Sequence, residues 1–186
     1  IVDQHMHLDR ENRFISAAGE FSRSGGTEIF LVHKPSFSKS LPTDLNGYRE
    51  AYRGTIKMAE IVRKKTELKV NVVLGPHPVV WDIQANDIGV KESSELHISA
   101  VGLALDMIEE GEAICLGEVG RPHYSVPEDR WTEANDLLLE IMRMASTSNS
   151  PVQLHVEENG NQTCKDIASL CNRSGLPKKR TIRHFA

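Results

Sequence analysis

Apolar residues along this chain alternate between short dense runs and longer segments in which they recur every three or four positions. Five segments have the spacing of amphipathic helices, namely residues 11–24, 47–65, 91–110, 127–147 and 161–173. Six dense runs separate or flank them and are typical of strands covered on both faces, namely residues 1–8, 27–35, 69–78, 113–122, 151–158 and 181–186. Residues 79–90 are expected to form a loop or a short helix.

This strict alternation of strands and helices predicts an α/β protein with a parallel sheet and right-handed crossovers. Both a doubly wound open sheet and a TIM barrel fit the order of elements. No G-x-G-x-x-G motif follows the first strand, which lowers the weight of a dinucleotide-binding fold. At 186 residues, the chain is expected to be a single domain.

Histidines are concentrated at the predicted carboxyl ends of the strands. Only His97 falls in a helix; the other seven of the eight are His5, His7, His33, His77, His123, His155 and His184. The carboxyl ends of parallel strands meet on one rim, where α/β enzymes place their active sites. Any one of these residues could be structural, but the set predicts a functional rim.

The fourth predicted strand adds a carboxylate to this rim. The stretch "CLGEVG" places Glu118 between two glycines after an apolar run. Burying a carboxylate there is costly unless it is paired or bound to metal, and a carboxylate can bridge two ions. A pair of ions about 3.5–4 Å apart would fit a site made of several histidines and one carboxylate. The candidate ligands are His5, His7, Glu118, His155 and His184.

Composition narrows the expected partners. The net charge is −4, and no apolar stretch approaches the roughly 18 residues of a membrane span. The two basic clusters, residues 63–65 and 178–180, precede strands and therefore lie on the rim opposite the histidines, so long duplex DNA is not an evident partner. Three cysteines without C-x-x-C spacing, and no visible signal peptide, favour a cytoplasmic protein with reduced thiols. The oligomeric state is left open.

Five motifs in order resemble those of the TatD-like metal-dependent hydrolases, in the amidohydrolase superfamily. They are "DQHMHL", "LGPHP", "GEVG", "VQLHVEE" and "RHFA", and they span essentially the whole chain. The stretches "GEVGRPHY" and "LVHKP" are most similar to the archaeal-type branch. The resemblance implies a TIM (β/α)8 barrel, of which this chain would supply the first six strands.

The resemblance also implies a site with two divalent ions. His5 and His7 would hold one ion and His155 and His184 the other, with Glu118 bridging them as a catalytic group. Zinc is the first expectation for this N/O ligand set, with magnesium, manganese or nickel as alternatives. The family pattern includes an aspartate at the end of strand eight, beyond Ala186. We therefore expect the sequence to be part of a chain of about 250 residues or more; a copy that has lost activity is the alternative.

The expected activity is metal-assisted hydrolysis. A small phosphoester or a nucleic-acid end is the favoured substrate, a small amide, ester or lactone is the second possibility, and a non-catalytic metal-binding barrel stays open. Arg121 is suited to a phosphate or carboxylate group. The expected substrate-binding residues are Arg121, His123, His77 and His33. Asp3 and Glu157 are expected to support ligands from behind.

Two connections on the active rim are long for a βα unit. Residues 36–46 and 79–90 are expected to form a lid, with Phe37 and Trp81 as apolar walls. Packing of Trp81 against the body of the protein is an equally good expectation.

Overall fold

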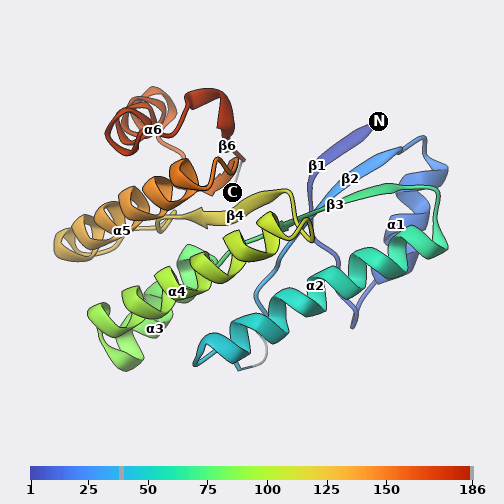
Figure 1. Cartoon of the computed structure of the whole chain (residues 1–186), viewed down its shortest axis with the longest axis horizontal. Helices are drawn as coiled ribbons and strands as arrows, with labels where there is room; N and C mark the ends of the chain where they lie inside the picture. The colour runs from blue at the N-terminus through green and yellow to red at the C-terminus, as the bar shows by residue number, and fades with distance from the viewer. Residues whose placement is uncertain (38–39, 185–186) are drawn as a thin grey trace.

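A curved sheet of six parallel strands forms the centre of the molecule, with helices arranged around it in chain order (Figure 1). The computed structural model describes residues 1–37 and 40–184. The strands are β1 (Val2–Met6), β2 (Glu28–Val32), β3 (Lys69–Leu74), β4 (Cys115–Gly120), β5 (Val152–His155) and β6 (Thr181–Arg183). Their order in the sheet is their order in the chain, and each pairs in parallel with the next. The alternation read from the sequence therefore gives the expected α/β topology.

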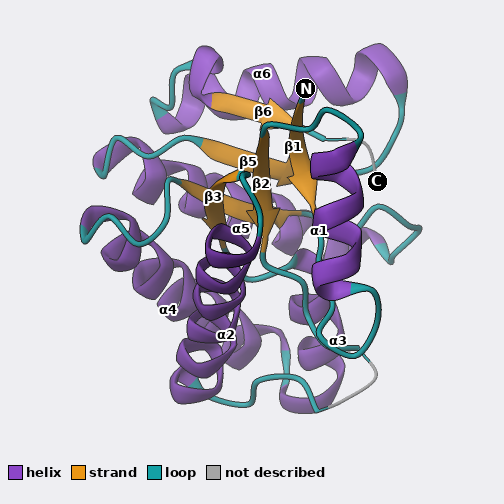
Figure 2. Ribbon diagram, turned by 90° about the vertical axis from the view of Figure 1, so that its right-hand side faces the viewer, coloured by secondary structure: helices purple, strands orange, loops and turns teal. Residues whose placement is uncertain are grey.

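Helices cover the sheet on its outer side (Figure 2). They are α1 (Phe14–Arg23), α2 (Leu45–Lys65), α3 (Pro78–Ile88), α4 (Val90–Glu109), α5 (Glu128–Thr147) and α6 (Gly160–Ser174), followed by a 3-10 turn, η1 (Lys178–Arg180). Asp44 caps the start of helix α2, and its side chain accepts a hydrogen bond from the Gly47 N–H at 2.8 Å. None of the helices in the described residues is long and apolar enough to cross a membrane.

The segment 79–90 is mostly helix α3, not a loop. Pro78 occupies the first turn, where its missing N–H costs nothing. Trp81 is 1% exposed, and its Nε1–H donates to Ser94 Oγ at 2.9 Å. The expected lid over these residues is therefore wrong, and Trp81 packs against α4. In the other connection, residues 38–39 lie outside the described part, while Phe37 is half exposed beside the carboxyl ends of the strands.

The core lies between the strands and their helices. Strand β4 is buried along its whole length, and Leu138 and Ile141 of α5 are completely covered. Burying one such side chain contributes about 1.5–3 kcal/mol, so this layer dominates the stability of the sheet.

The sheet curls into half a barrel. Strands β1 and β5 are separated by three others in the sheet, yet the side chain of Gln153 on β5 bonds to Gln4 and His5 on β1. The pairing register shifts inside β1, between Asp3 and Met6, and irregularities of this kind bend a strand and re-aim its side chains. The curl brings the carboxyl ends of all six strands towards one place.

Candidate metal centre

Glu118, at the carboxyl end of β4, is the residue around which the predicted ligands gather. Its side chain is 2% exposed, and four imidazoles lie against its two oxygens. Gly120 lets β4 lie close to β5 here, since a Cβ on it would stand 1.8 Å from the His155 carbonyl oxygen. The curl of the sheet supplies the other neighbours, from β1 and from the end of β6.

One oxygen of Glu118 faces the two histidines of the first motif. Oε2 lies 3.5 Å from His5 Nε2 and 3.2 Å from His7 Nε2. The two nitrogens are 3.2 Å from each other. Three candidate ligand atoms thus converge on one point.

The other oxygen faces a second pair. Glu118 Oε1 is 2.9 Å from His155 Nδ1 and also pairs with His184 Nε2. These two nitrogens are 3.3 Å apart. Each oxygen of one carboxylate therefore has its own pair of imidazole nitrogens, which is the arrangement of a bridging ligand.

The chemistry of these donors fits a cation. His5 Nδ1 faces Gln153 Oε1 at 2.9 Å, and His7 Nδ1 faces the Val32 carbonyl at 3.0 Å. Both partners accept hydrogen bonds, so we assign the hydrogen of each ring to Nδ1. The two Nε2 lone pairs then point at each other and at a carboxylate, which is unfavourable unless a positive charge lies between them. Such outer contacts are usual for metal-binding histidines.

Other groupings of the same atoms are also compact enough for an ion. Ligand atoms of His5, Glu118 and His184 lie within 4.8 Å of one another, as do those of His77, Glu118 and His155. His77 begins helix α3, and its Nδ1 accepts the Val79 N–H at 3.2 Å. Its hydrogen is then on Nε2, 4.0 Å from Glu118 Oε2. We therefore regard His77 as a hydrogen-bond donor towards the centre and not as a ligand.

Burial and charge act in opposite directions on these groups. Burial opposes ionisation of Glu118, but its contacts with the imidazoles of His155, His184, His5 and His7 outweigh burial and hold its pKa far below the ordinary value. Burial likewise disfavours the charged form of His7, but the Glu118 carboxylate and the Val32 carbonyl raise its pKa overall. The centre thus retains a carboxylate at any ordinary pH.

The three other predicted rim histidines lie beside the centre. His33 is buried, with Nδ1 2.9 Å from Thr55 Oγ1, and burial lowers its pKa to about 4. Burial also lowers the pKa of His77, to about 3, so both are neutral near pH 7. His123 Nδ1 lies 2.7 Å from His155 Nε2, on the side of that ring away from Glu118. All three are within reach of the same rim.

The surroundings of Arg121 do not support its expected role as an anion-binding residue. Its side chain is 2% exposed. The guanidinium makes a bidentate ion pair with Glu157, in which Nε donates to Oε2 at 2.7 Å and Nη2 donates to Oε1. Nη1 donates to Asn135 Oδ1, and the group lies 4.5 Å from the centre of the Trp131 ring. Arg121 is therefore held in a buried ion pair between the ends of β4 and β5.

Glu157 and Asp3, which were expected to support the ligands, make different kinds of contact. Burial disfavours the charged form of Glu157, but Arg121 lowers the pKa of this carboxyl overall. Its strong contact is with Arg121, beside the His155 strand end. Asp3 Oδ1 accepts the backbone N–H of His5 at 2.9 Å. It therefore supports the backbone of a candidate ligand.

Gln153 is a site residue that the sequence analysis missed. It is 1% exposed and contacts His5 across the inside of the half-barrel. The available signal was its position two residues before His155, because alternate residues of a strand share a face. A polar residue on the ligand face of β5 was therefore visible in "VQLH".

The family model described as "TatD related DNase" matches residues 2–186. The chain belongs to this family. At 26% identity, it is similar to an uncharacterised protein of Methanocaldococcus jannaschii, over 99% of this chain and 64% of that protein. The chain thus spans less than two thirds of the length of that curated relative.

Solved structures show the same fold. A TatD-like protein from Archaeoglobus fulgidus is similar over 98% of this chain and 67% of its own, with a TM-score of 0.61 and 15% identity. An uncharacterised amidohydrolase from Saccharomyces cerevisiae matches 97% of this chain and 57% of its own, with a TM-score of 0.59 and 12% identity. The expected fold class is therefore confirmed, as six strands of a TatD-like barrel. The family is one of metal-dependent hydrolases, and the histidine groups around Glu118 are candidate metal ligands.

Proposed function

We propose that this protein is a hydrolase with a two-ion centre, in which His5 and His7 hold one divalent ion and His155 and His184 the other, with Glu118 bridging. The observation that carries the proposal is that the two oxygens of one buried carboxylate face separate pairs of imidazole nitrogens. Zinc is the first expectation, with magnesium, manganese or nickel as alternatives. Bound ions would supply an activated water and an electrophile for the scissile bond.

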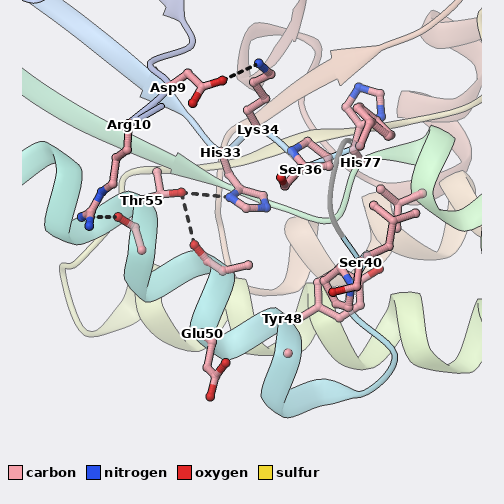
Figure 3. Close-up of a pocket in the computed structure, with 18 of the residues that line it drawn as sticks. Asp9, Arg10, His33, Lys34, Ser36, Ser40, Tyr48, Glu50, Thr55 and His77 are labelled. Carbon is pink, nitrogen blue, oxygen red and sulfur yellow. Dashed lines mark hydrogen bonds and ion pairs between the residues drawn. The ribbon is translucent and has the colours of Figure 1, made fainter. Parts of the chain in front are cut away.

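The chain's own groups would hold the substrate in an adjoining cavity of about 850 Å³. His33 and His77 line its wall, and His33 contacts Thr55 of helix α2 (Figure 3). Phe37 adds an apolar edge, with its ring 5.9 Å from that of His77. The Nε2–H of His77 points towards Glu118 and is placed to donate a hydrogen bond to a substrate oxygen. A cavity of this size suits a small molecule or the end of a longer chain.

A small phosphoester or a nucleic-acid end is the first substrate candidate. Lys34 and Arg10 line the cavity and could attract a phosphate (Figure 3). The description of the matching family model, "TatD related DNase", agrees with this choice. Long duplex DNA is not expected, because the chain has a net charge of −4.

A small amide, ester or lactone is the second candidate, and a specific observation favours it. The cation best suited to a phosphate, Arg121, is occupied by Glu157. Lys34 pairs with Asp9 at 3.5 Å, and the cavity wall also carries Glu11 and Glu50. This balance of charge favours an uncharged substrate over an anionic one.

Metal content and substrate choice can be measured in one series. The purified protein is analysed for metals, stripped with a chelator, reloaded with zinc, manganese or magnesium, and assayed on aryl phosphoesters, a short single-stranded oligonucleotide, a cyclic amide and a lactone. Metal-dependent phosphoester cleavage is the expected result, and cleavage of the amide or lactone alone would select the second candidate. Bound metal without turnover would favour the non-catalytic barrel, and absence of metal binding would overturn the site.

Matched variants show whether the assigned ligands are responsible. His5→Ala and His155→Ala should each lose the ion that the residue is proposed to hold, and hydrolysis with it. His97→Leu removes a buried histidine outside the centre and should keep both. Retention of metal by both alanine variants would contradict the assignment.

A further inference from the structure

Gln153 joins two strands that are not neighbours in the sheet. Its Oε1 lies 2.9 Å from His5 Nδ1, and its Nε2–H donates to the Gln4 carbonyl at 2.9 Å. Strands β2, β3 and β4 separate these partners in the order of the sheet. The side chain therefore crosses the inside of the half-barrel from β5 to β1.

The two contacts define each other. Because the Gln4 carbonyl can only accept, the NH2 group of Gln153 must face it, and the amide oxygen must face His5. His5 then carries its hydrogen on Nδ1, and its Nε2 lone pair is left for the centre beside Glu118. If the oxygen and nitrogen of the Gln153 amide changed places, the hydrogen bonds to Gln4 and to His5 Nδ1–H would both be lost. The Gln153 amide therefore favours the tautomer of His5 that is protonated at Nδ1.

Two glycines leave room for this crossing. A Cβ on Gly117 would lie 2.8 Å from the Gln153 Cβ and 2.9 Å from its carbonyl oxygen. A Cβ on Gly75, just after β3, would lie 2.9 Å from the Gly117 backbone nitrogen. A larger residue at position 117 would fill space that Gln153 occupies, and one at position 75 would push Gly117 out of its place.

We propose that Gln153 is a positioning residue for the metal centre: it fixes the tautomer of His5 and holds β1 against β5, so that His5 Nε2 meets Glu118. The inference rests on the proposed function, because it takes His5 as a ligand. Outer-shell partners of metal-binding histidines typically change affinity 10–100-fold when they are replaced. A loss of that size is expected here, with zinc as the probe.

Three variants separate positioning from simple structural support. Gln153→Leu removes both hydrogen bonds, whereas Gln153→Glu keeps an acceptor for His5 and loses the donor to Gln4. Gln84→Leu is the matched control, because Gln84 is also buried, accepts the Tyr48 hydroxyl at 3.3 Å and donates to the Pro42 carbonyl, away from the centre. Zinc affinity is measured by competition with a chelating dye, and stability by urea unfolding of the metal-free protein.

The expected result is that Gln153→Leu binds zinc about 10–100-fold more weakly, while Gln153→Glu stays within about fivefold of wild type despite its lower stability. Gln84→Leu should lose stability without losing affinity. The inference is overturned if Gln153→Leu binds zinc normally, or if the Glu variant loses as much affinity as the Leu variant.

The tautomer of His5 can be measured without any variant or metal. Long-range ¹H–¹⁵N spectra of the metal-free wild-type protein should show His5 protonated at Nδ1; protonation at Nε2 would overturn the inference even if Gln153→Leu fails to fold. Failure of the proposed function looks different, because wild-type protein would then bind no zinc or hydrolyse nothing whatever the state of His5.

Discussion

The imidazole rings of His5 and His184 are stacked, with centroids 3.8 Å apart and planes inclined by 12°. His5 lies in β1 and His184 follows β6, the two outermost strands of the sheet in the described residues. A flat sheet would hold these strands far apart, since neighbouring strands are spaced by about 4.8 Å. The stack therefore depends on the curl of the sheet, and it closes the ring of side chains around Glu118.

His184→Phe tests the contribution of the His184 ring stacking separately from that of its ring nitrogen. The phenyl ring can keep the stack on His5, but the ligand atom beside Glu118 Oε1 is lost. We expect the variant to keep the ion of the His5 and His7 pair and to lose the other, about half of the bound metal. Elemental analysis gives the stoichiometry, and a thermal melt of the metal-free protein is the control for folding. Full retention of two ions would contradict the assignment of His184.

The gathering of the candidate ligands could be predicted because it depends on local features. Strand ends are visible from the alternation of apolar runs, and parallel strands place all their carboxyl ends together. His5, Glu118 and His155 needed no knowledge of which strand touches which. The helix at residues 78–88 was harder to predict, because its first residues are the apolar "PVVW" and resemble the end of a strand.

The roles of Arg121 and Gln153 could not be predicted in the same way. Arg121 follows a strand end, like a substrate-binding residue, and only the approach of Glu157 from the next strand turns it into a buried ion pair. Gln153 was visible as a polar residue on the ligand face, but its partner His5 lies on the opposite side of the half-barrel. Pair contacts between distant strands depend on curvature, which the hydrophobic pattern does not report.

Arg121→Met tests whether this arginine is structural. Removing one member of a buried ion pair leaves the other charge uncompensated, which costs about 3 kcal/mol of unfolding free energy. Urea unfolding measures that loss. Arg143→Met is the control, because the Arg143–Glu140 pair on α5 is about half exposed, and its loss should cost about 0.5 kcal/mol or less. If Arg121→Met has normal stability and a raised KM, Arg121 binds substrate and is not structural.

His97→Leu should make the protein more stable, and more so in acid. His97 is completely buried in α4, and neither ring nitrogen has a hydrogen-bond partner of good geometry in the described residues. Burial lowers its pKa to about 3, although the nearby Pro76 carbonyl acts weakly in the other direction. Removing two unsatisfied polar atoms is worth about 1 kcal/mol at pH 7.

The pH dependence follows from the lowered pKa of His97. In the unfolded chain His97 binds a proton near pH 6.5, whereas in the folded protein it stays neutral until about pH 3. The free energy of unfolding of the wild type is therefore unaffected by protonation of His97 above pH 6.5 and falls as the pH drops below that value. Each such histidine costs up to about 1.4 kcal/mol per pH unit in that range. Unfolding at pH 7 and pH 4.5 should show a shallower acid loss for the variant. Some loss remains, because His33 and His77 are also buried and neutral. An unchanged acid dependence would show that His97 does not titrate in this way.

Two glycine-to-alanine substitutions should change the free energy of unfolding in opposite directions. A methyl group on Gly120 would stand 1.8 Å from the carbonyl oxygen and 2.7 Å from the carbonyl carbon of His155, and backbone atoms cannot move aside cheaply. Strand β4 would have to withdraw from β5, which breaks the 3.1 Å bond from the Arg121 N–H to the His155 carbonyl. We expect Gly120→Ala to lose about 3 kcal/mol or more. Its zinc affinity should fall with it, because Glu118 moves with β4.

Gly54 is the control for this comparison. It lies inside helix α2, and a Cβ there would meet no atom within 4 Å. Alanine is favoured over glycine in a helix interior, so Gly54→Ala should gain about 0.5–1 kcal/mol and keep its metal. Thermal and urea unfolding of both variants, with zinc titration, measure the two effects side by side. Equal stability of the two variants would mean that β4 and β5 can separate without cost, and that the close approach at Gly120 does not hold Glu118 against His155.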